Sequence, residues 1–259
     1  MNIYDIIPDK NEKPLDRLVE GYSHTSIFRT IAFVGDSLSS GEFETRRADG
    51  SAGFYDFYEY SWGQFIARHN GSKAYNFSIG GMTAQGYDSY ADWRSFWRRD
   101  LACQAYVIAL GYNDMGDSPD IGSAEDVDVN NYKNNKKSFM GNYAAIVSKY
   151  KEISPDAKFF FVTFANESED GIPSKTAQKM ADALYTLADM FDNCYVIDLL
   201  KYGPVYNEEF KRRYYNHFHM TPTGYLLTAR LVDSYIDYII RHNPDDFKNA
   251  GFIGTGIEY

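Results

Sequence analysis

The sequence predicts an α/β protein of three layers, in which helices cover both faces of a five-stranded parallel sheet with a flavodoxin-like strand order. Short apolar runs alternate along the chain with longer segments of helical spacing, as in folds built from strand–helix–strand units. The runs are continuously apolar, which is typical of parallel strands covered on both faces. The length of 259 residues fits one such domain, so we expect a single domain with an N-terminal extension over 1–29 and a C-terminal tail over 243–259.

Five apolar runs bounded by polar residues or glycine are predicted to form the sheet. They are 30–34, 73–77, 105–110, 158–163 and 195–198. Right-handed crossovers would bring the carboxyl ends of all five strands to one edge of the sheet. Because ligands of open α/β sheets bind beyond that edge, we expect the functional residues to follow the strand ends.

Four segments have apolar residues at helical spacing and are predicted to be helices. They are 60–69, 131–151, 173–191 and 222–240. Thr221 before Pro222 is a good helix start, because a capping hydroxyl precedes a residue whose missing N–H costs nothing there. The segments 41–57 and 114–137 are expected to be loops, and 41–57 and 114–130 are expected to form the walls of a pocket.

Composition excludes some classes of function. A net charge of -10 argues against a nucleic-acid surface, which needs clustered Lys and Arg. No apolar run approaches the roughly 18 residues of a membrane span, and no secretion signal is recognised at the N-terminus. Cys103 and Cys194 each begin an apolar run and are expected to be reduced core residues. These features favour a cytoplasmic protein, and the 17% aromatic content favours neutral or carbohydrate-like ligands.

The tetrapeptide Gly35-Asp36-Ser37-Leu38 directly follows the predicted strand 30–34. A serine at this point lies where a buried strand runs into a turn, so its hydroxyl can be fixed and still meet a substrate. A serine hydroxyl is a poor nucleophile unless a base accepts its proton and donors stabilise the oxyanion that forms. Taken alone, such a serine is more often a turn or cap residue.

Three further residues would complete the chemistry. Gly81 can bring its N–H close to a ligand because no side chain intervenes. Asn113, after the run 105–110, carries an amide N–H, and His219, before the capped helix, is the candidate base. Each alone has an ordinary structural role in a turn or in the core. Their joint occurrence at strand and helix boundaries favours a catalytic site.

These motifs resemble those of the GDSL or SGNH hydrolase family of esterases, lipases and acylhydrolases, over positions 33 to about 225. Ser37 matches the nucleophile of the family's Gly-Asp-Ser-Leu motif, and His219 matches its catalytic histidine. Gly81 and Asn113 match the oxyanion residues, which act beside the backbone N–H of Ser37. The resemblance implies a three-layer α/β/α fold and a reaction that needs no metal and no cofactor.

One position departs from the family pattern. The family usually places an aspartate three residues before the histidine, and this chain has Asn216 there. Asn216 could support His219 through its carbonyl oxygen, or a backbone carbonyl could do so and leave a Ser–His dyad. Asp36 adjoins the nucleophile and Asp114 is expected to brace a turn, so both are weaker candidates for the acid. His217 is a weaker candidate for the base.

The leading hypothesis is a serine esterase or acylhydrolase that cleaves a small or carbohydrate-linked ester through an acyl-enzyme on Ser37. The alternative is a catalytically weak or inactive relative that binds an acylated or carbohydrate ligand in the same pocket, and Asn216 motivates it. Acyl transfer to an alcohol is a third option. The acyl length, the alcohol and the oligomeric state stay open.

Overall fold

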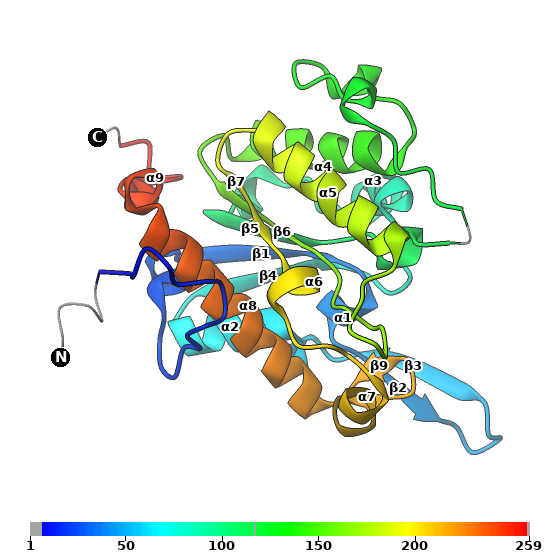
Figure 1. The fold of residues 1–259 in the computed structure, drawn as a ribbon. Coiled ribbons are helices and arrows are strands. Elements are labelled where there is room, and N and C mark those ends of the chain that lie inside the picture. The colour runs from blue at the N-terminus through cyan, green and yellow to red at the C-terminus, as the bar shows by residue number, and fades with distance from the viewer. Residues whose placement is uncertain (1–6, 117, 258–259) are drawn as a thin grey trace.

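The computed structural model describes residues 7–116 and 118–257. Its centre is a parallel sheet in the order β4-β1-β5-β6-β7, which is the predicted flavodoxin-like order (Figure 1). The strands are β1 (Thr30–Gly35), β4 (Lys73–Ser78), β5 (Ala105–Ala109), β6 (Lys158–Val162) and β7 (Cys194–Ile197). The five predicted strands are therefore confirmed, each with bounds that differ by one residue or two.

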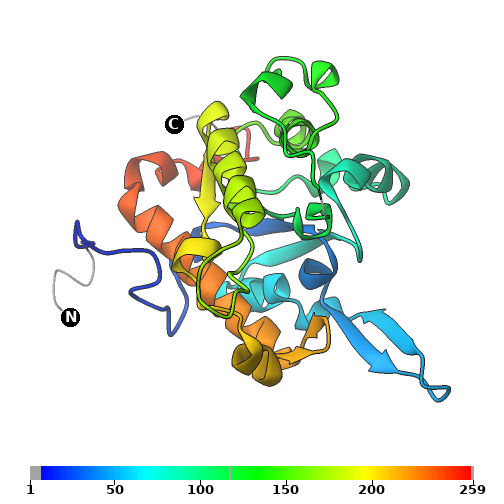
Figure 2. The same cartoon turned by 45° about the vertical axis from the view of Figure 1, so that its right-hand side comes forward.

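Helices cover both faces of the sheet, as Figures 1 and 2 show. One face carries α3 (Ala84–Trp93), α4 (Phe139–Ile153) and α5 (Lys175–Met190), and the other carries α2 (Trp62–Asn70) and α8 (Pro222–His242). Successive residues of β1 alternate between the two cores: Ala32 and Val34 pack with α4, whereas Ile31 and Phe33 pack with α8. Burial on both faces explains why the strands read as continuous apolar runs.

The predicted helices are confirmed, with one large shift of a boundary. The helix expected from residue 131 begins at Phe139, because the Ser138 side chain caps it by accepting a hydrogen bond from the N–H of Gly141. The segment before it holds short 3-10 turns, including Tyr132–Asn134. Helix α3, capped by Thr83, was not predicted from the sequence.

The segment 41–57, expected to be a loop, instead forms an antiparallel hairpin, so that prediction was wrong. Its strands are β2 (Glu42–Arg46) and β3 (Ala52–Asp56), with Glu42 paired to Asp56 at the base. Gly41 makes the turn into β2 at φ +76°, and a Cβ there would lie 2.7 Å from the carbonyl oxygen of Phe57. The hairpin projects from the body of the protein (Figure 2).

The remaining elements are short and complete the edges of the fold. They are α1 (Ser37–Ser40), α6 (Leu199–Tyr202), α7 (Glu208–Tyr214), α9 (Pro244–Phe247), β8 (Tyr215–Asn216) and β9 (His219–Met220). The C-terminal tail packs on the body through the buried Phe247. Cys103 and Cys194 are unpaired, as predicted. Within the described ranges, the helices are all too short or too polar to cross a membrane.

Candidate active site

Three of the predicted site residues follow neighbouring strands at the carboxyl edge of the sheet. Gly35, the last residue of β1, pairs with Ser78 of β4 and Ala109 of β5. Ser37, Gly81 and Asn113 come shortly after these three strand ends. The parallel register therefore brings the three loops to one corner, as the sequence predicted.

Ser37 is the first residue of the short helix α1. Asp36 caps this helix, because its Oδ1 accepts a hydrogen bond of 3.0 Å from the N–H of Leu38. The Ser37 side chain is half-buried, and its Oγ forms no hydrogen bond with the part of the protein that the structure describes. The hydroxyl is thus available to a base and to a substrate.

The expected oxyanion residues lie in the loops beside Ser37. Gly81 is exposed at φ +71°, and apart from its chain neighbours no described residue has an atom within 4 Å of the position that a Cβ would occupy there. The amide Nδ2 of Asn113 donates to the carbonyl oxygen of Met82 at 3.0 Å and lies 3.4 Å from Oδ2 of Asp36. These contacts tie the three loops together and leave open space beside Gly81.

His219 reaches the same corner from the C-terminal part of the chain. It begins β9, which pairs with β8 across a tight turn in which His217 has φ +65°. Strand β9 lies against both α1 and β2 (Figure 1). The Thr221 side chain caps α8 directly after β9, by accepting a hydrogen bond from the N–H of Gly224. His219 is 9% exposed, so its ring is almost enclosed.

The His219 ring lies between two carboxylates of the hairpin strand β2. Its Nε2 is 2.9 Å from Oε1 of Glu42, and its Nδ1 is 3.6 Å from Oε2 of Glu44. No hydrogen bond joins Ser37 Oγ to His219 within the described chain. The structure therefore places the predicted nucleophile and base on adjacent elements, with Nε2 turned toward Glu42.

Glu42 and Glu44 were not recognised from the sequence as parts of the site. A Cβ at Gly80 would lie 2.5 Å from Oε2 of Glu42, so this carboxylate occupies space that a glycine leaves free. Burial raises the pKa of Glu42; the nearby charge of His219 opposes this, whereas Asp56 and Glu44 add to it. Glu42 thus gives up its negative charge more readily than an ordinary glutamate.

The two aspartates considered as alternative acids have structural partners. Both carboxylate oxygens of Asp114 accept from the N–H of Ala84, at 3.1 and 3.0 Å, and so brace the start of α3. Asp36 caps α1, and its burial, with the nearby charges of Asp114 and Glu42, raises its pKa to about 7 despite the hydrogen bond from Leu38. The ion pairs of His219 are instead with Glu42 and Glu44.

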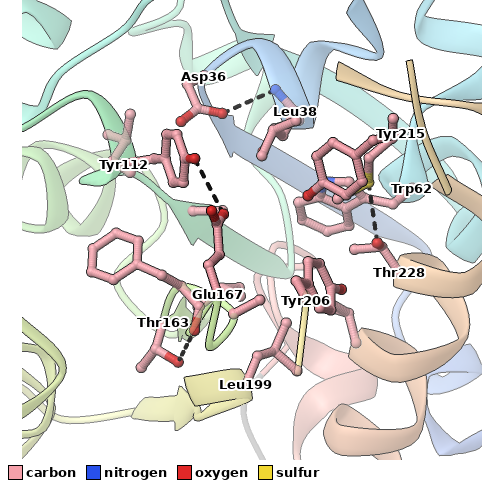
Figure 3. Close-up of a pocket in the computed structure, with 18 residues that line it drawn as sticks. Asp36, Leu38, Trp62, Tyr112, Thr163, Glu167, Leu199, Tyr206, Tyr215 and Thr228 are labelled. Atoms are coloured by element: carbon pink, nitrogen blue, oxygen red, sulfur yellow. Dashed lines mark hydrogen bonds between the residues drawn. The ribbon is translucent and has the colours of Figure 1, made fainter. Parts of the chain in front are cut away.

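A largely apolar cavity of about 80 Å³ lies beneath this corner, between the strand ends and α8 (Figure 3). Its walls include neighbours in sequence of the predicted catalytic residues: Leu38, Tyr112 and Met220. The Tyr112 hydroxyl donates to Glu167 Oε1 at 3.1 Å. Tyr215 also lines the cavity, whereas Tyr214 lines a separate surface groove.

Asn216 does not form the contact with the imidazole that the sequence suggested. Its Nδ2 donates to the backbone carbonyl oxygen of Glu44 at 2.9 Å. The Nδ1 of His219 is buried and has no hydrogen-bond partner among the described residues. In the parts of the chain that the structure describes, no cluster of three metal-ligating side chains is found.

Replacing Asn216 by aspartate is expected to lower thermal stability and to give no gain in turnover. The substitution would place an acceptor against the carbonyl oxygen of Glu44 and a second negative charge near its carboxylate. Loss of such a hydrogen bond costs about 1 kcal/mol of folding free energy. Thermal melting and ester hydrolysis by Asn216→Asp measure both effects; a large gain in turnover would contradict this account.

Comparisons with known proteins bear on the family and the fold. The sequence profile of the GDSL-like Lipase/Acylhydrolase family matches residues 33–227. No curated protein matches the chain. Among solved structures, a family two carbohydrate esterase from Clostridium thermocellum, solved with cellohexaose, is similar at 16% identity and TM-score 0.57, over 89% of this chain and 67% of that one.

Two further solved structures share the fold at low identity. A protein from Desulfitobacterium hafniense described as lipolytic, of the G-D-S-L family, is 16% identical with TM-score 0.52, over 80% of this chain and 99% of that one. The acetyl xylan esterase AlAXEase is 16% identical with TM-score 0.53, also over 80% of this chain and 99% of that one. The family match spans most of the chain, and this protein therefore belongs to the GDSL-like lipase/acylhydrolase family and is a carboxylic ester hydrolase.

Proposed function

We propose that this protein is a serine esterase that cleaves a small or carbohydrate-linked ester through an acyl-enzyme on Ser37, with His219 as the base. The observation that carries the proposal is the meeting of Ser37, Gly81 and Asn113 with the strand that bears His219, at one edge of the sheet. A nucleophile, oxyanion donors and a base are the groups that acyl transfer needs.

In the first half-reaction, His219 Nε2 accepts the proton of Ser37 Oγ as the oxygen attacks the ester carbonyl carbon. The carbonyl oxygen takes up the electron pair and receives hydrogen bonds from the backbone N–H groups of Ser37 and Gly81. The Asn113 amide adds a third donor, through the N–H held only by the 3.4 Å contact with Asp36. Collapse of the tetrahedral intermediate breaks the C–O bond, and the leaving alcohol takes the proton from His219.

In the second half-reaction, His219 takes a proton from water, which attacks the acyl carbon. The intermediate collapses, the proton returns to Ser37 Oγ, and the carboxylic acid leaves. This sequence requires Nε2 to turn from Glu42 to Ser37. Catalytic hydrogen bonds are often formed only once a substrate is bound.

Exposed aromatic rings near His219 favour a carbohydrate-linked ester. Phe54 of β3 is 50% exposed and lies edge-on to the His219 ring, with centroids 5.6 Å apart. Phe218, next to His219, is 71% exposed. Flat aromatic faces suit the apolar face of a sugar ring. Two of the similar solved structures are a carbohydrate esterase and an acetyl xylan esterase.

Hydrolysis of p-nitrophenyl esters of increasing acyl length, together with acetylated xylo- and cello-oligosaccharides, tests the proposal. We expect turnover of acetyl esters and release of acetate from at least one acetylated saccharide. A fluorophosphonate probe should add to Ser37, as peptide mass spectrometry would show. Absence of both ester turnover and labelling of Ser37 would refute the proposal.

A second candidate function has one observation in its favour. Because Glu42 holds Nε2 of His219, the protein could bind an acylated carbohydrate and turn it over weakly or not at all. Calorimetric binding of an acetylated oligosaccharide without release of acetate would support this alternative.

A further inference from the structure

We propose that Glu44 of the hairpin strand β2 is the positioning carboxylate of His219, in the role that the family usually gives to an aspartate at position 216. The inference rests on the proposed function, because it assigns the group that orients the base of that reaction. The carboxylate that positions His219 would then come from a hairpin more than a hundred residues earlier in the chain, and not from the segment next to His219.

The first argument is the environment of His219 Nδ1. This atom is buried, and no group in residues 7–116 or 118–257 forms a hydrogen bond with it. The carboxylate oxygen paired with it is Oε2 of Glu44, at 3.6 Å. That separation is an ion-pair distance and slightly too long for a hydrogen bond. The proposal requires this contact to shorten when the ring turns to free Nε2 from Glu42.

The second argument is that Glu44 is held in place by the turn that precedes His219. Its Oε2 accepts from the N–H of Phe218 at 3.3 Å, and its Oε1 lies 2.9 Å from Nδ1 of His217. The Glu44 side chain is 11% exposed. A carboxylate fixed by two neighbours of the base is pre-organised to orient that base.

The third argument explains why position 216 is an asparagine. The Asn216 amide donates to the backbone carbonyl oxygen of Glu44, so it fastens β2 to the segment that carries His219. Asn216 and His219 are directly paired residues of β8 and β9. Asn216, at the position of the family's aspartate, thereby holds strand β2, and β2 supplies the carboxylate of Glu44 instead.

The fourth argument separates Glu44 from Glu42. Burial raises the pKa of Glu44, but the hydrogen bond from Phe218 and the charge and hydrogen bond of His217 outweigh it and lower this pKa overall. The pKa of Glu42 is instead raised, with Asp56 of β3 among the causes. Glu44 thus keeps its negative charge to lower pH than Glu42 does. The negative charge of Glu44 is therefore the one that balances the imidazolium.

In the proposed reaction Glu44 stays ionised throughout. The Nδ1–H of His219 points at Oε2 of Glu44, which fixes the tautomer with Nε2 free to accept the proton of Ser37. When the imidazolium forms, the negative charge on Glu44 stabilises it, and no proton passes to the carboxylate.

The test is kinetic analysis of Glu44→Gln and Glu44→Asp, with Glu59→Gln as a matched control. Glu59 lies just after the hairpin, and its side chain is 73% exposed. Glu44→Gln should lower kcat roughly 10²–10⁴-fold with KM little changed, by analogy with loss of the carboxylate in serine proteases. The acid limb of its kcat/KM profile should move to lower pH, because the imidazolium loses a stabilising charge. Glu44→Asp should keep part of the activity, and Glu59→Gln all of it.

Direct observation of the wild type keeps the inference testable if Glu44→Gln does not fold. In protein labelled with ¹⁵N-histidine and phosphonylated on Ser37, Nδ1 of His219 should carry a proton with a strongly downfield resonance. Absence of that proton would overturn the inference. So would a folded Glu44→Gln with unchanged kcat and pH profile. If Ser37→Ala stays fully active, the proposed function itself fails, and that result is distinct from either of these.

Discussion

Replacing Ser37 by alanine is expected to lower kcat for ester hydrolysis by roughly 10⁶-fold, the loss seen when the nucleophile of a serine protease is removed. The Ser37 hydroxyl is the side-chain group that bonds covalently to the acyl carbon in the proposed mechanism. No other described residue at the corner offers a replacement of the same kind, because Ser39 and Ser40 are turned into the protein and buried.

The substitution should leave stability nearly unchanged, which makes the kinetic result simple to interpret. Ser37 Oγ forms no hydrogen bond with the described protein, and alanine is favourable in the first turn of α1. Melting temperature and circular dichroism of Ser37→Ala should therefore match the wild type. Affinity for an acetylated ligand, measured by calorimetry, should also be retained.

Ser72→Ala is the matched control, because Ser72 lies just before β4 at the amino edge of the sheet and donates to the carbonyl oxygen of Phe28. It should keep wild-type turnover. If Ser37→Ala kept wild-type turnover, the reaction would not pass through an acyl-enzyme on Ser37. Water would then attack the bound ester directly.

The sheet and the three loops beyond it could be predicted because their signals are local. Each strand is a continuous apolar run, and parallel topology fixes where the runs end relative to one another. Ser37, Gly81 and Asn113 each follow a strand directly, so locating the strands also located these residues. The prediction for His219 rested on the helix start at Thr221, which the structure confirms.

The two glutamates could not be predicted in the same way, because their proximity to His219 depends on a hairpin that lies outside the sheet. The segment Glu42–Arg46 is short and has a single apolar residue, Phe43, so its strand signal is weak. Tertiary contacts fix the hairpin, among them Phe43, which packs against Tyr225 of α8 with centroids 5.6 Å apart, and the hydrogen bond from Asn216 to Glu44. Without such contacts, nothing in the sequence places Glu44 beside a histidine near the other end of the chain.

Replacing His219 by alanine should also lower kcat, by about as much as Ser37→Ala, because nucleophile and base act as a unit. Unlike Ser37→Ala, it should change stability as well. The charge of His219 is the influence that lowers the pKa of Glu42, so its removal leaves Glu42, Glu44 and Asp56 facing one another without it. The pKa of Glu42 in the folded protein would then lie further above its value in the unfolded chain.

The sign of the resulting pH dependence follows from proton binding. Between the unfolded and folded pKa values of Glu42, the folded protein holds more protons than the unfolded chain, so stability falls as pH rises. Melting temperatures of His219→Ala should therefore decline more steeply than those of the wild type as pH rises through this range. His69→Ala, at a half-exposed histidine of α2, serves as the control for both measurements. Retained turnover in His219→Ala would show that another group is the base. If the melting temperatures of His219→Ala and of the wild type changed equally with pH, the imidazole would have no influence on the pKa of Glu42.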